Sequence, residues 1–332
     1  MVARPSLKKL YEVAGRRLLI DAEDEWSDLA VARLFSGWYL TPLADFESHA
    51  DATIKISCGS FMPAVPKGLD AFDISHGGTC YTDGETLYLN IDESLVIVRP
   101  GLMSPTVRVW IKQGYDFWSE ILAQLISQAF SSALRRCGLF ELHSGGVLPP
   151  NKERAFLIVG ESGSGKSTLT LQLATCGWRY LSDDILLLDD TSQGIEAHSL
   201  RRFFALTADT IDAVQLPNLQ STANARIKER LAPEDLFPAG RAISARPGTI
   251  LFSAITDESG SRVRRLSQYE TMARLLRQCP WATYDKSTAG PHLKTLSGLT
   301  GQTIGYDLFA GRDLLGNPAR TEDLFAGCLR EL

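Results

Sequence analysis

The segment Gly-Glu-Ser-Gly-Ser-Gly-Lys-Ser, residues 160–167, has the spacing of glycines, lysine and hydroxyl that binds nucleotide phosphates. Glycines let the chain wrap a phosphate with its backbone N–H groups pointing inward, and a following helix adds partial positive charge. Lys166 can reach the β- and γ-phosphates, and the Ser167 hydroxyl can ligate Mg²⁺. The candidate nucleotide-binding residues are Gly160, Glu161, Ser162, Gly163, Ser164, Gly165, Lys166, Ser167 and Thr168.

The residues on either side of this loop have the composition that phosphate binding requires. Residues 155–159 form an apolar run with the length of a buried strand, and residues 168–176 continue as a helix with leucines at three positions. Strand, glycine loop and helix in this order are the expected setting for a phosphate-binding loop. The alternative is a glycine turn that binds nothing, and the setting speaks against it.

Two adjacent carboxylates, Asp183 and Asp184, follow shortly after the loop. Gly177 ends the predicted helix in the left-handed conformation that glycine adopts most easily. Residues 178–181 then run back as a short strand, which returns the two aspartates to the phosphates. Two carboxylates there can hold Mg²⁺ and accept a proton from an attacking hydroxyl. A competing interpretation takes residues 185–190 as the acidic strand of an ordinary P-loop ATPase; we favour Asp183 and Asp184 and predict a turn at 189–190.

Composition and charge exclude several classes of protein. The net charge of −5 argues against nucleic acid or an acidic membrane as the main partner, because both select basic surfaces. No apolar stretch approaches the length of a transmembrane helix, and residues 1–17 do not resemble a signal peptide. The six cysteines are scattered without a C-x-x-C pair, which predicts free thiols in a reducing compartment, with the cytoplasm as the default location.

The pattern of the chain changes near residue 115. Before it, short strand-like runs dominate (residues 10–15, 16–21, 52–57, 86–91 and 94–99), with one helix predicted over 24–35. Residues 116–136 then form a long amphipathic helix that ends before Gly138, and strands alternate with helices to the C-terminus. We therefore predict an α/β protein with a β-rich α+β domain over residues 1–115 and a nucleotide-binding domain over 116–332. The polar segment 218–238 is either a loop over the site or a simple connection.

From the phosphate-binding loop to the aspartate pair, residues 160–184 resemble the nucleotide site of the HPr kinase/phosphorylase family of bacterial serine kinases. The segment Leu-His-Ser-Gly-Gly-Val, residues 142–147, is similar to the His-Gly-Val segment that precedes the loop strand in that family. The resemblance covers residues 140–190 well and the rest of the second half loosely. It implies a P-loop fold of the phosphoenolpyruvate carboxykinase type for residues 116–332.

The resemblance also implies roles for individual residues. The loop and Lys166 bind the phosphates of ATP, Ser167 and Asp184 bind Mg²⁺, and Asp183 is the base that deprotonates an acceptor serine. His143 lies beside the active site, and Arg246 is a candidate for steadying phosphate charge. The N-terminal half does not match the regulatory domain of these enzymes, so HPr is not the expected acceptor. The chain looks more like the branch that phosphorylates precursor peptides, including lasso-peptide precursors; self-association stays open.

Three hypotheses on function follow. The first is an ATP- and Mg²⁺-dependent kinase that phosphorylates a serine of a peptide or small protein in the cytoplasm, without nucleic acid or membrane as partner. The second replaces the peptide with a small metabolite that carries a hydroxyl. The third is a regulatory protein that senses ATP without transferring phosphate, for which a base at Asp183 is unnecessary.

Overall fold

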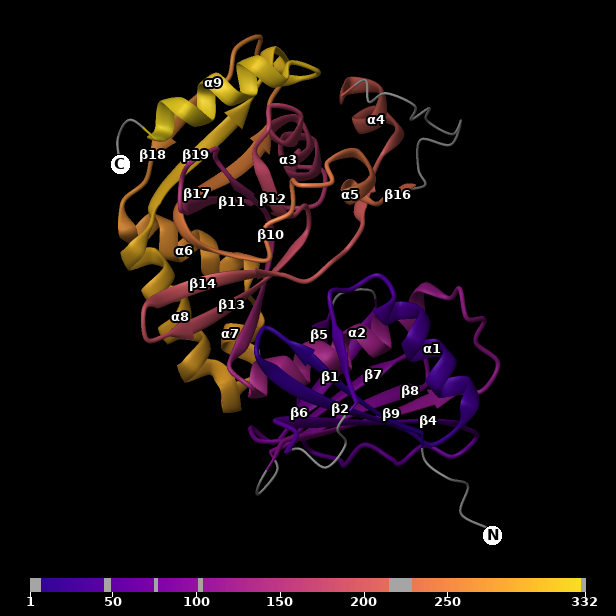
Figure 1. Ribbon diagram of the computed structural model, residues 1–332. Coiled ribbons are helices and arrows are strands. Elements are labelled where there is room, and N and C mark those ends of the chain that lie inside the picture. The colour runs from indigo at the N-terminus through magenta and orange to yellow at the C-terminus, as the bar shows by residue number, and fades with distance from the viewer. Residues whose placement is uncertain (1–6, 45–48, 75–76, 101–103, 215–228, 330–332) are drawn as a thin grey trace. The chain divides into compact units, whose positions relative to one another are not determined.

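The structure is a computed structural model that describes residues 7–44, 49–74, 77–100, 104–214 and 229–329 (Figure 1). The chain has a mixed α/β fold with two large sheets. Its internal contacts divide it into two compact units. Unit 1 comprises Met1–Phe140 and Trp281–His292, and unit 2 comprises Glu141–Pro280 and Leu293–Leu332.

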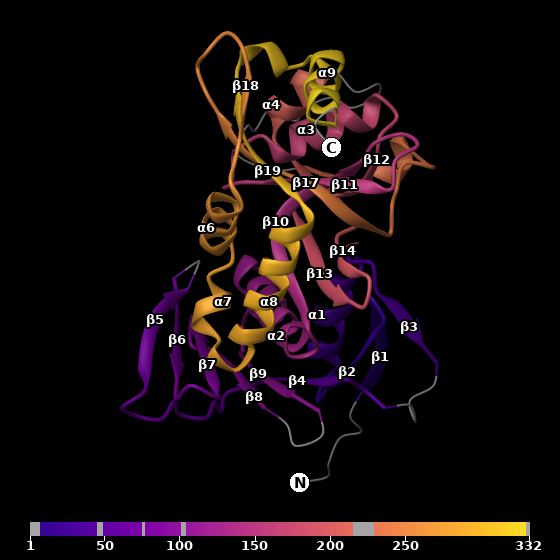
Figure 2. The same cartoon turned by 90° about the vertical axis from the view of Figure 1, so that its left-hand side faces the viewer.

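Unit 1 contains a nine-stranded sheet with the order β3-β1-β2-β4-β9-β8-β7-β6-β5, and Figure 2 shows these strands from β5 at one edge to β3 at the other. The strands are β1 (Leu7–Val13), β2 (Arg16–Ala22), β3 (Thr41–Leu43), β4 (Ala52–Gly59), β5 (Asp70–Ile74), β6 (Gly78–Thr82), β7 (Leu87–Ile91), β8 (Ser94–Arg99) and β9 (Thr106–Lys112). Each of the five predicted strands overlaps an observed one, although the first is β1 at Leu7–Val13 rather than 10–15, because residues 14–15 form the turn to β2. Alternating burial along β4 is the reason its pattern was readable.

Two long helices accompany this sheet. Helix α1 (Glu25–Phe35) begins as predicted, because the Asp24 carboxylate accepts a hydrogen bond from the Ser27 backbone N–H at 2.8 Å. Helix α2 (Glu120–Arg136) starts four residues later than the pattern suggested and packs on β4, β8 and β9. Gly138 follows it with φ of +79°, the left-handed conformation expected at a helix end. Because α2 packs on the first sheet, the contacts divide the chain after Phe140, whereas the change of pattern in the sequence suggested residue 115.

Unit 2 is built on an eight-stranded sheet with the order β11-β10-β13-β14-β17-β19-β18, in which β12 also pairs with β10. Its strands are β10 (Leu139–Leu148), β11 (Arg154–Val159), β12 (Arg179–Ser182), β13 (Ile185–Thr191), β14 (Gly194–Ser199), β17 (Ser244–Ile255), β18 (Arg262–Arg265) and β19 (Ile304–Ala310). Strand β11 therefore runs between antiparallel β10 and parallel β17, which pairs with it as well. This arrangement decides which residues flank the loop that follows β11.

The remaining elements of the chain are short strands and helices. They are α3 (Lys166–Thr175), β15 (Phe204–Leu206), α4 (Ala208–Val214), β16 (Glu229–Leu231), α5 (Pro233–Leu236), α6 (Gln268–Gln278), α7 (Trp281–Tyr284), α8 (Lys286–Gln302), η1 (Arg312–Leu314) and α9 (Pro318–Leu329). Of the polar segment 218–238, residues 218–228 lie outside the described part of the chain, and the rest forms β16 and α5. The predicted turn at 189–190 is wrong: Asp189 and Asp190 lie in β13, and Asp190 pairs with Lys294 at 2.6 Å.

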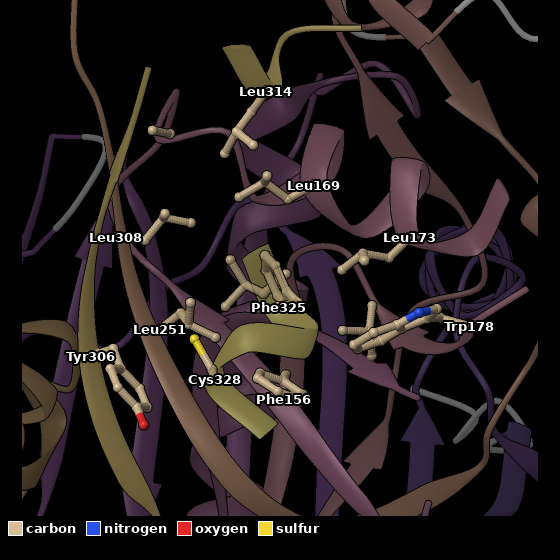
Figure 3. Packing of buried hydrophobic residues seen from close by; sticks show 13 residues of the cluster. Phe156, Leu169, Leu173, Trp178, Leu251, Tyr306, Leu308, Leu314, Phe325 and Cys328 are labelled. Carbon is tan, nitrogen blue, oxygen red and sulfur yellow. The ribbon is translucent and has the colours of Figure 1, made fainter. Parts of the chain in front are cut away.

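A hydrophobic core fixes α3 against the sheet of unit 2 (Figure 3). Leu169 and Leu173 of α3 pack with Phe325 of α9, and both views of the chain show α3 beside α9 (Figures 1 and 2). The Phe156 ring of β11 lies 5.4 Å from the Phe325 ring and 5.6 Å from the Trp178 ring, measured between centroids. The strand before the loop and the helix after it therefore share one core, which holds both ends of the loop.

All six cysteines are free thiols, as the sequence predicts. No helix among the described residues combines the length and the apolarity needed to cross a membrane.

Candidate phosphate-binding site

The loop between β11 and α3 has the backbone that its glycines predict. Gly163 and Gly165 have φ of +83° and +89°, a region that residues with a side chain rarely adopt. A Cβ on Gly160 would lie 2.5 Å from the Ser164 hydroxyl oxygen and 2.7 Å from the Ser253 carbonyl oxygen, so only glycine fits there. The predicted order of strand, glycine loop and helix is confirmed, and α3 presents its N-terminal end to the loop.

The Lys166 side chain is buried beneath this loop. Its ammonium donates hydrogen bonds to the carbonyl oxygens of Gly160 and Glu161, at 2.8 and 2.9 Å. These carbonyls hold the charge at the loop, where it can interact with an incoming phosphate.

Asp183 is a buried carboxylate behind the first turn of α3. One of its oxygens accepts hydrogen bonds from the Ser167 hydroxyl at 2.9 Å and from the Ala205 backbone N–H at 3.1 Å. The other oxygen is buried without a hydrogen-bond partner among the described residues. Burial, reinforced by the neighbouring charge of Asp184, raises the pKa of Asp183 to about 6. The two hydrogen bonds lower that pKa, but burial outweighs them.

Asp184 lies next along the chain in a different environment. Its carboxylate pairs with His143 Nε2 at 2.6 Å and with the Arg201 guanidinium at 2.8 Å. Burial by itself raises the pKa of Asp184, but the His143 hydrogen bond and the Arg201 charge outweigh burial and lower that pKa to about 2. The two aspartates therefore differ in pKa and in partners, although they are adjacent in sequence.

A cavity of about 940 Å³ connects these groups. Its walls include His143, Lys166, Ser167, Thr168 and Asp184, together with residues of α4 and with Ile255 and Leu315. Asp183 does not line it and is only 1% exposed. A second cavity of about 470 Å³ lies against the first residues of the loop, Gly160–Ser164, and against Arg274 and Arg277 of α6.

The oxygen atoms at this site fit Mg²⁺. Hydroxyl, carboxylate and phosphate oxygens are the ligands that this ion takes, usually with several waters retained. Ser167 and Asp184 supply such oxygens on the wall of the cavity. Asp183 lies directly behind Ser167, and one of its oxygens is buried without a hydrogen-bond partner among the described residues. No three His, Cys, Asp or Glu side chains within the described ranges converge as a metal cluster, so a metal here would depend on Ser167 and on phosphate oxygens.

The structure brings together most of the residues that the sequence singled out, with one exception. Arg246 lies near the start of β17, paired in register with Arg154 at the start of β11, and donates a hydrogen bond to Gln193. The loop follows the opposite end of β11, six residues further on. At about 3.3 Å per residue along a strand, Arg246 is too far away to reach phosphates on the loop, so the role expected for it is not supported.

Sequence reasoning missed Arg201, which binds Asp184 from the segment between β14 and β15. It stands in the pair Arg201-Arg202, and nothing in that pattern distinguishes a site residue from a surface charge. Ile255 and Leu315 were missed for a similar reason, because isolated apolar residues at the ends of strands and turns carry no motif.

Comparisons with known proteins give little further identification. No protein-family model matches the sequence, and no curated protein matches it significantly. Among solved structures, the chain is similar to the Hpr(Ser) kinase/phosphatase from Coxiella burnetii, with 12% sequence identity and a TM-score of 0.33 over 57% of this chain and 97% of that chain. A TM-score this low does not establish a shared fold, so the family resemblance of the loop region stays a prediction.

Proposed function

We propose that this protein is an ATP- and Mg²⁺-dependent kinase that transfers the γ-phosphate to a hydroxyl, namely a serine of a peptide or small protein. One observation carries the proposal. A phosphate-binding loop with a buried lysine shares one cavity with Asp184, and the loop's own Ser167 is hydrogen-bonded to Asp183. A protein that only holds phosphate needs the loop, whereas transfer to a hydroxyl also needs acidic groups beside it.

The loop and Lys166 bind and orient the phosphates. Backbone N–H groups of the loop and the N-terminal end of α3 meet the negative charge, and Lys166 exchanges its carbonyl partners for phosphate oxygens. Asp183 holds the Ser167 hydroxyl in place from behind. Ser167 would hold Mg²⁺ together with phosphate oxygens, with Asp183 positioning its hydroxyl, and the ion when bound neutralises charge on the transferring phosphoryl group.

The acceptor hydroxyl needs a partner on the surface of the cavity. Asp184 lines the cavity, whereas Asp183 is buried, and a group that accepts a proton must come within hydrogen-bond reach of it. Burial thus supports the reverse of the division expected from sequence. Asp184, with His143 and Arg201 beside it, orients the acceptor hydroxyl and accepts its proton, and Asp183 positions Ser167 and, through it, the metal. A low pKa does not exclude this role for Asp184, since the transition state of phosphoryl transfer is loose and depends mainly on positioning.

A serine of a peptide or small protein as the acceptor, the cytoplasm as the location, and the absence of nucleic acid and membrane partners belong to the same proposal. They rest on the sequence resemblance and on the net charge of −5.

Phosphate transfer from γ-labelled ATP with Mg²⁺, to candidate peptides and to host-cell extract, tests the proposal. Asp184→Asn should lower transfer by about a hundredfold or more while ATP binding persists. Asp190→Asn is the matched control, because Asp190 pairs with Lys294 outside the cavity. Transfer that is undiminished in Asp184→Asn, or absent from the unaltered protein with every acceptor, contradicts the proposal.

The dependence of activity on the Mg²⁺ concentration distinguishes the roles of the two aspartates. Asp183→Asn weakens the hold on the metal, so raising the Mg²⁺ concentration should restore part of its activity. Asp184→Asn loses the contact to the acceptor, and added Mg²⁺ should restore little. If Mg²⁺ rescues Asp184→Asn and not Asp183→Asn, the division predicted from sequence is the correct one.

A further inference from the structure

Two large apolar side chains on the wall of the 940 Å³ cavity are exposed. Ile255 is 62% exposed and Leu315 is 66% exposed, although most large apolar side chains of unit 2 are buried. An apolar surface inside a cavity that also contains convergent polar groups is typical of a site for a small molecule. Both residues lie outside the machinery described so far.

The backbone on both sides of Leu315 is held in place. The carbonyl oxygen of Leu314 accepts a buried hydrogen bond of 2.8 Å from Gln172 Nε2 of α3. Gly316 has φ of +64°, and a Cβ at that position would lie 2.6 Å from the Ala213 carbonyl oxygen of α4. The helix that follows the phosphate loop and the helix α4 therefore fix the position from which Leu315 projects.

The backbone at Ile255, beside the loop, is held in place as well. It ends β17, where it pairs in parallel register with Ala310 of β19. The Ser253 hydroxyl two residues earlier donates a hydrogen bond of 2.7 Å to the Ser164 carbonyl oxygen within the loop. A Cβ built on Gly165 would lie 3.7 Å from Ile255 Cγ1, so the isoleucine adjoins the N-terminal end of α3.

The order of strands separates these apolar groups from the acidic ones. The loop follows β11, which has β10 on one side and β17 on the other. His143 lies on β10 and pairs with Asp184, whereas Ile255 lies on β17. The cavity therefore has the His143–Asp184 pair on the β10 side of the phosphate loop and Ile255 on the β17 side.

Helix α4 adds hydrogen-bond acceptors near the start of α3. The hydroxyl oxygens of Thr168 and Thr210 lie 3.0 Å apart, which ties the first turn of α3 to α4. Asp209 and Asp212 of the same helix are exposed and line the cavity. Carboxylates only accept hydrogen bonds, and the hydroxyls of a ribose donate them.

We infer that this side of the cavity binds the nucleoside half of the nucleotide: the base packs against Ile255 and Leu315, and the ribose hydroxyls face Asp209 and Asp212. A nucleoside triphosphate has the same distribution of chemistry, with anionic phosphates at one end and a flat, weakly polar base at the other. The inference rests on the proposed function, because it requires the phosphates on the loop. It goes further in assigning the residues that distinguish a nucleotide from a bare polyphosphate.

Titration calorimetry on the full chain, with Mg²⁺-ATP and with Mg²⁺-tripolyphosphate as separate ligands, tests the inference. Ile255→Ala and Leu315→Ala should each weaken ATP binding about fivefold to tenfold, the effect of losing part of an apolar contact. Binding of tripolyphosphate should stay within about twofold, since that ligand has no base. Ile243→Ala is the matched control, because Ile243 is 70% exposed and does not line the cavity.

The outcomes separate the two proposals. If the variants bind both ligands as tightly as the unaltered protein, or lose affinity for both equally, the nucleoside subsite is overturned. Phosphate binding by the loop is then unaffected. An equal loss of ATP affinity in Ile243→Ala also overturns it, because the effect is then not local. An unaltered protein that binds neither ligand overturns the proposed function and this inference together.

Discussion

The buried carboxyl of Asp183 makes the stability of unit 2 depend on pH. Desolvation raises its pKa from 3.8 to about 6, and the group is 1% exposed. The informative change is Asp183→Asn, in which the amide oxygen can accept the hydrogen bonds from Ser167 and Ala205 while the charge disappears.

The size of the pH effect on the free energy of unfolding follows from the difference in protonation of Asp183 between the folded and the unfolded chain. Between pH 3.8 and about 6, the folded protein keeps the proton that the unfolded chain has lost, so stability falls as pH rises through this window and is constant above it. At about 1.4 kcal/mol for each pH unit, the full loss is about 3 kcal/mol. The asparagine variant has no such proton. Its free energy of unfolding relative to the unaltered protein should therefore rise by about 2 kcal/mol between pH 4.5 and pH 7.5.

Amide hydrogen exchange in β11 and β17 measures this difference within unit 2, which matters because a chain of two units need not unfold in one step. Both proteins are measured at the same pH, so the intrinsic exchange rates cancel. The new amide N–H₂ would occupy the position of the unpartnered oxygen and can lower the free energy of unfolding. That contribution does not change with pH, so it cancels from the difference between pH 4.5 and pH 7.5. Asp257→Asn removes an exposed carboxylate of the same unit and is the control. A difference that stays flat from pH 4.5 to 7.5 would refute the account of Asp183.

Two further predictions concern the loop and the acidic pair. Gly160→Ala should weaken tripolyphosphate binding at least tenfold in calorimetry, because the new Cβ would displace Ser164 and the Ser253 carbonyl. Gly290→Ala is the control, because a Cβ there has nothing within 4 Å, and it should leave the affinity unchanged. Equal affinities of the two variants would refute the steric argument. Arg201→Gln removes a charge that lowers the pKa of Asp184, so the acidic limb of the pH–rate profile should move to higher pH, and an unmoved limb would exclude Asp184 as the titrating group.

The parts of the site that the sequence predicts are local in the chain. The loop, the strand before it and the helix after it lie within about twenty residues, and each has its own signal in glycine spacing or apolar pattern. The same holds for α1, whose cap at Asp24 needs only three residues to recognise. These elements require no knowledge of which strands pair.

The parts that the sequence does not predict depend on pairing between distant segments. Asp183 and Asp184 share one residue type and adjacent positions, so only the fold can tell which is buried against Ser167 and which meets Arg201. The resemblance made Arg246 a candidate for steadying phosphate charge, but parallel pairing of β17 with β11 places it at the opposite end from the loop. Helix α2 was assigned to the second domain by a change of pattern, whereas packing on the first sheet groups it with unit 1.

The segment after His143 has a packing role that explains why glycines stand there. A Cβ on Gly145 would lie 2.7 Å from the Thr170 hydroxyl oxygen of α3, and a Cβ on Gly146 would lie 3.0 Å from Leu186 of β13. Side chains at these positions would therefore push α3 and β13 away from β10. Because β12, which leads into Asp183, pairs with β10 beside them, the two glycines also let the aspartate reach Ser167. The glycines of this segment thus allow the close packing that assembles the part of the cavity holding Asp184, and His143 is the one side chain of residues 142–147 that lines the cavity.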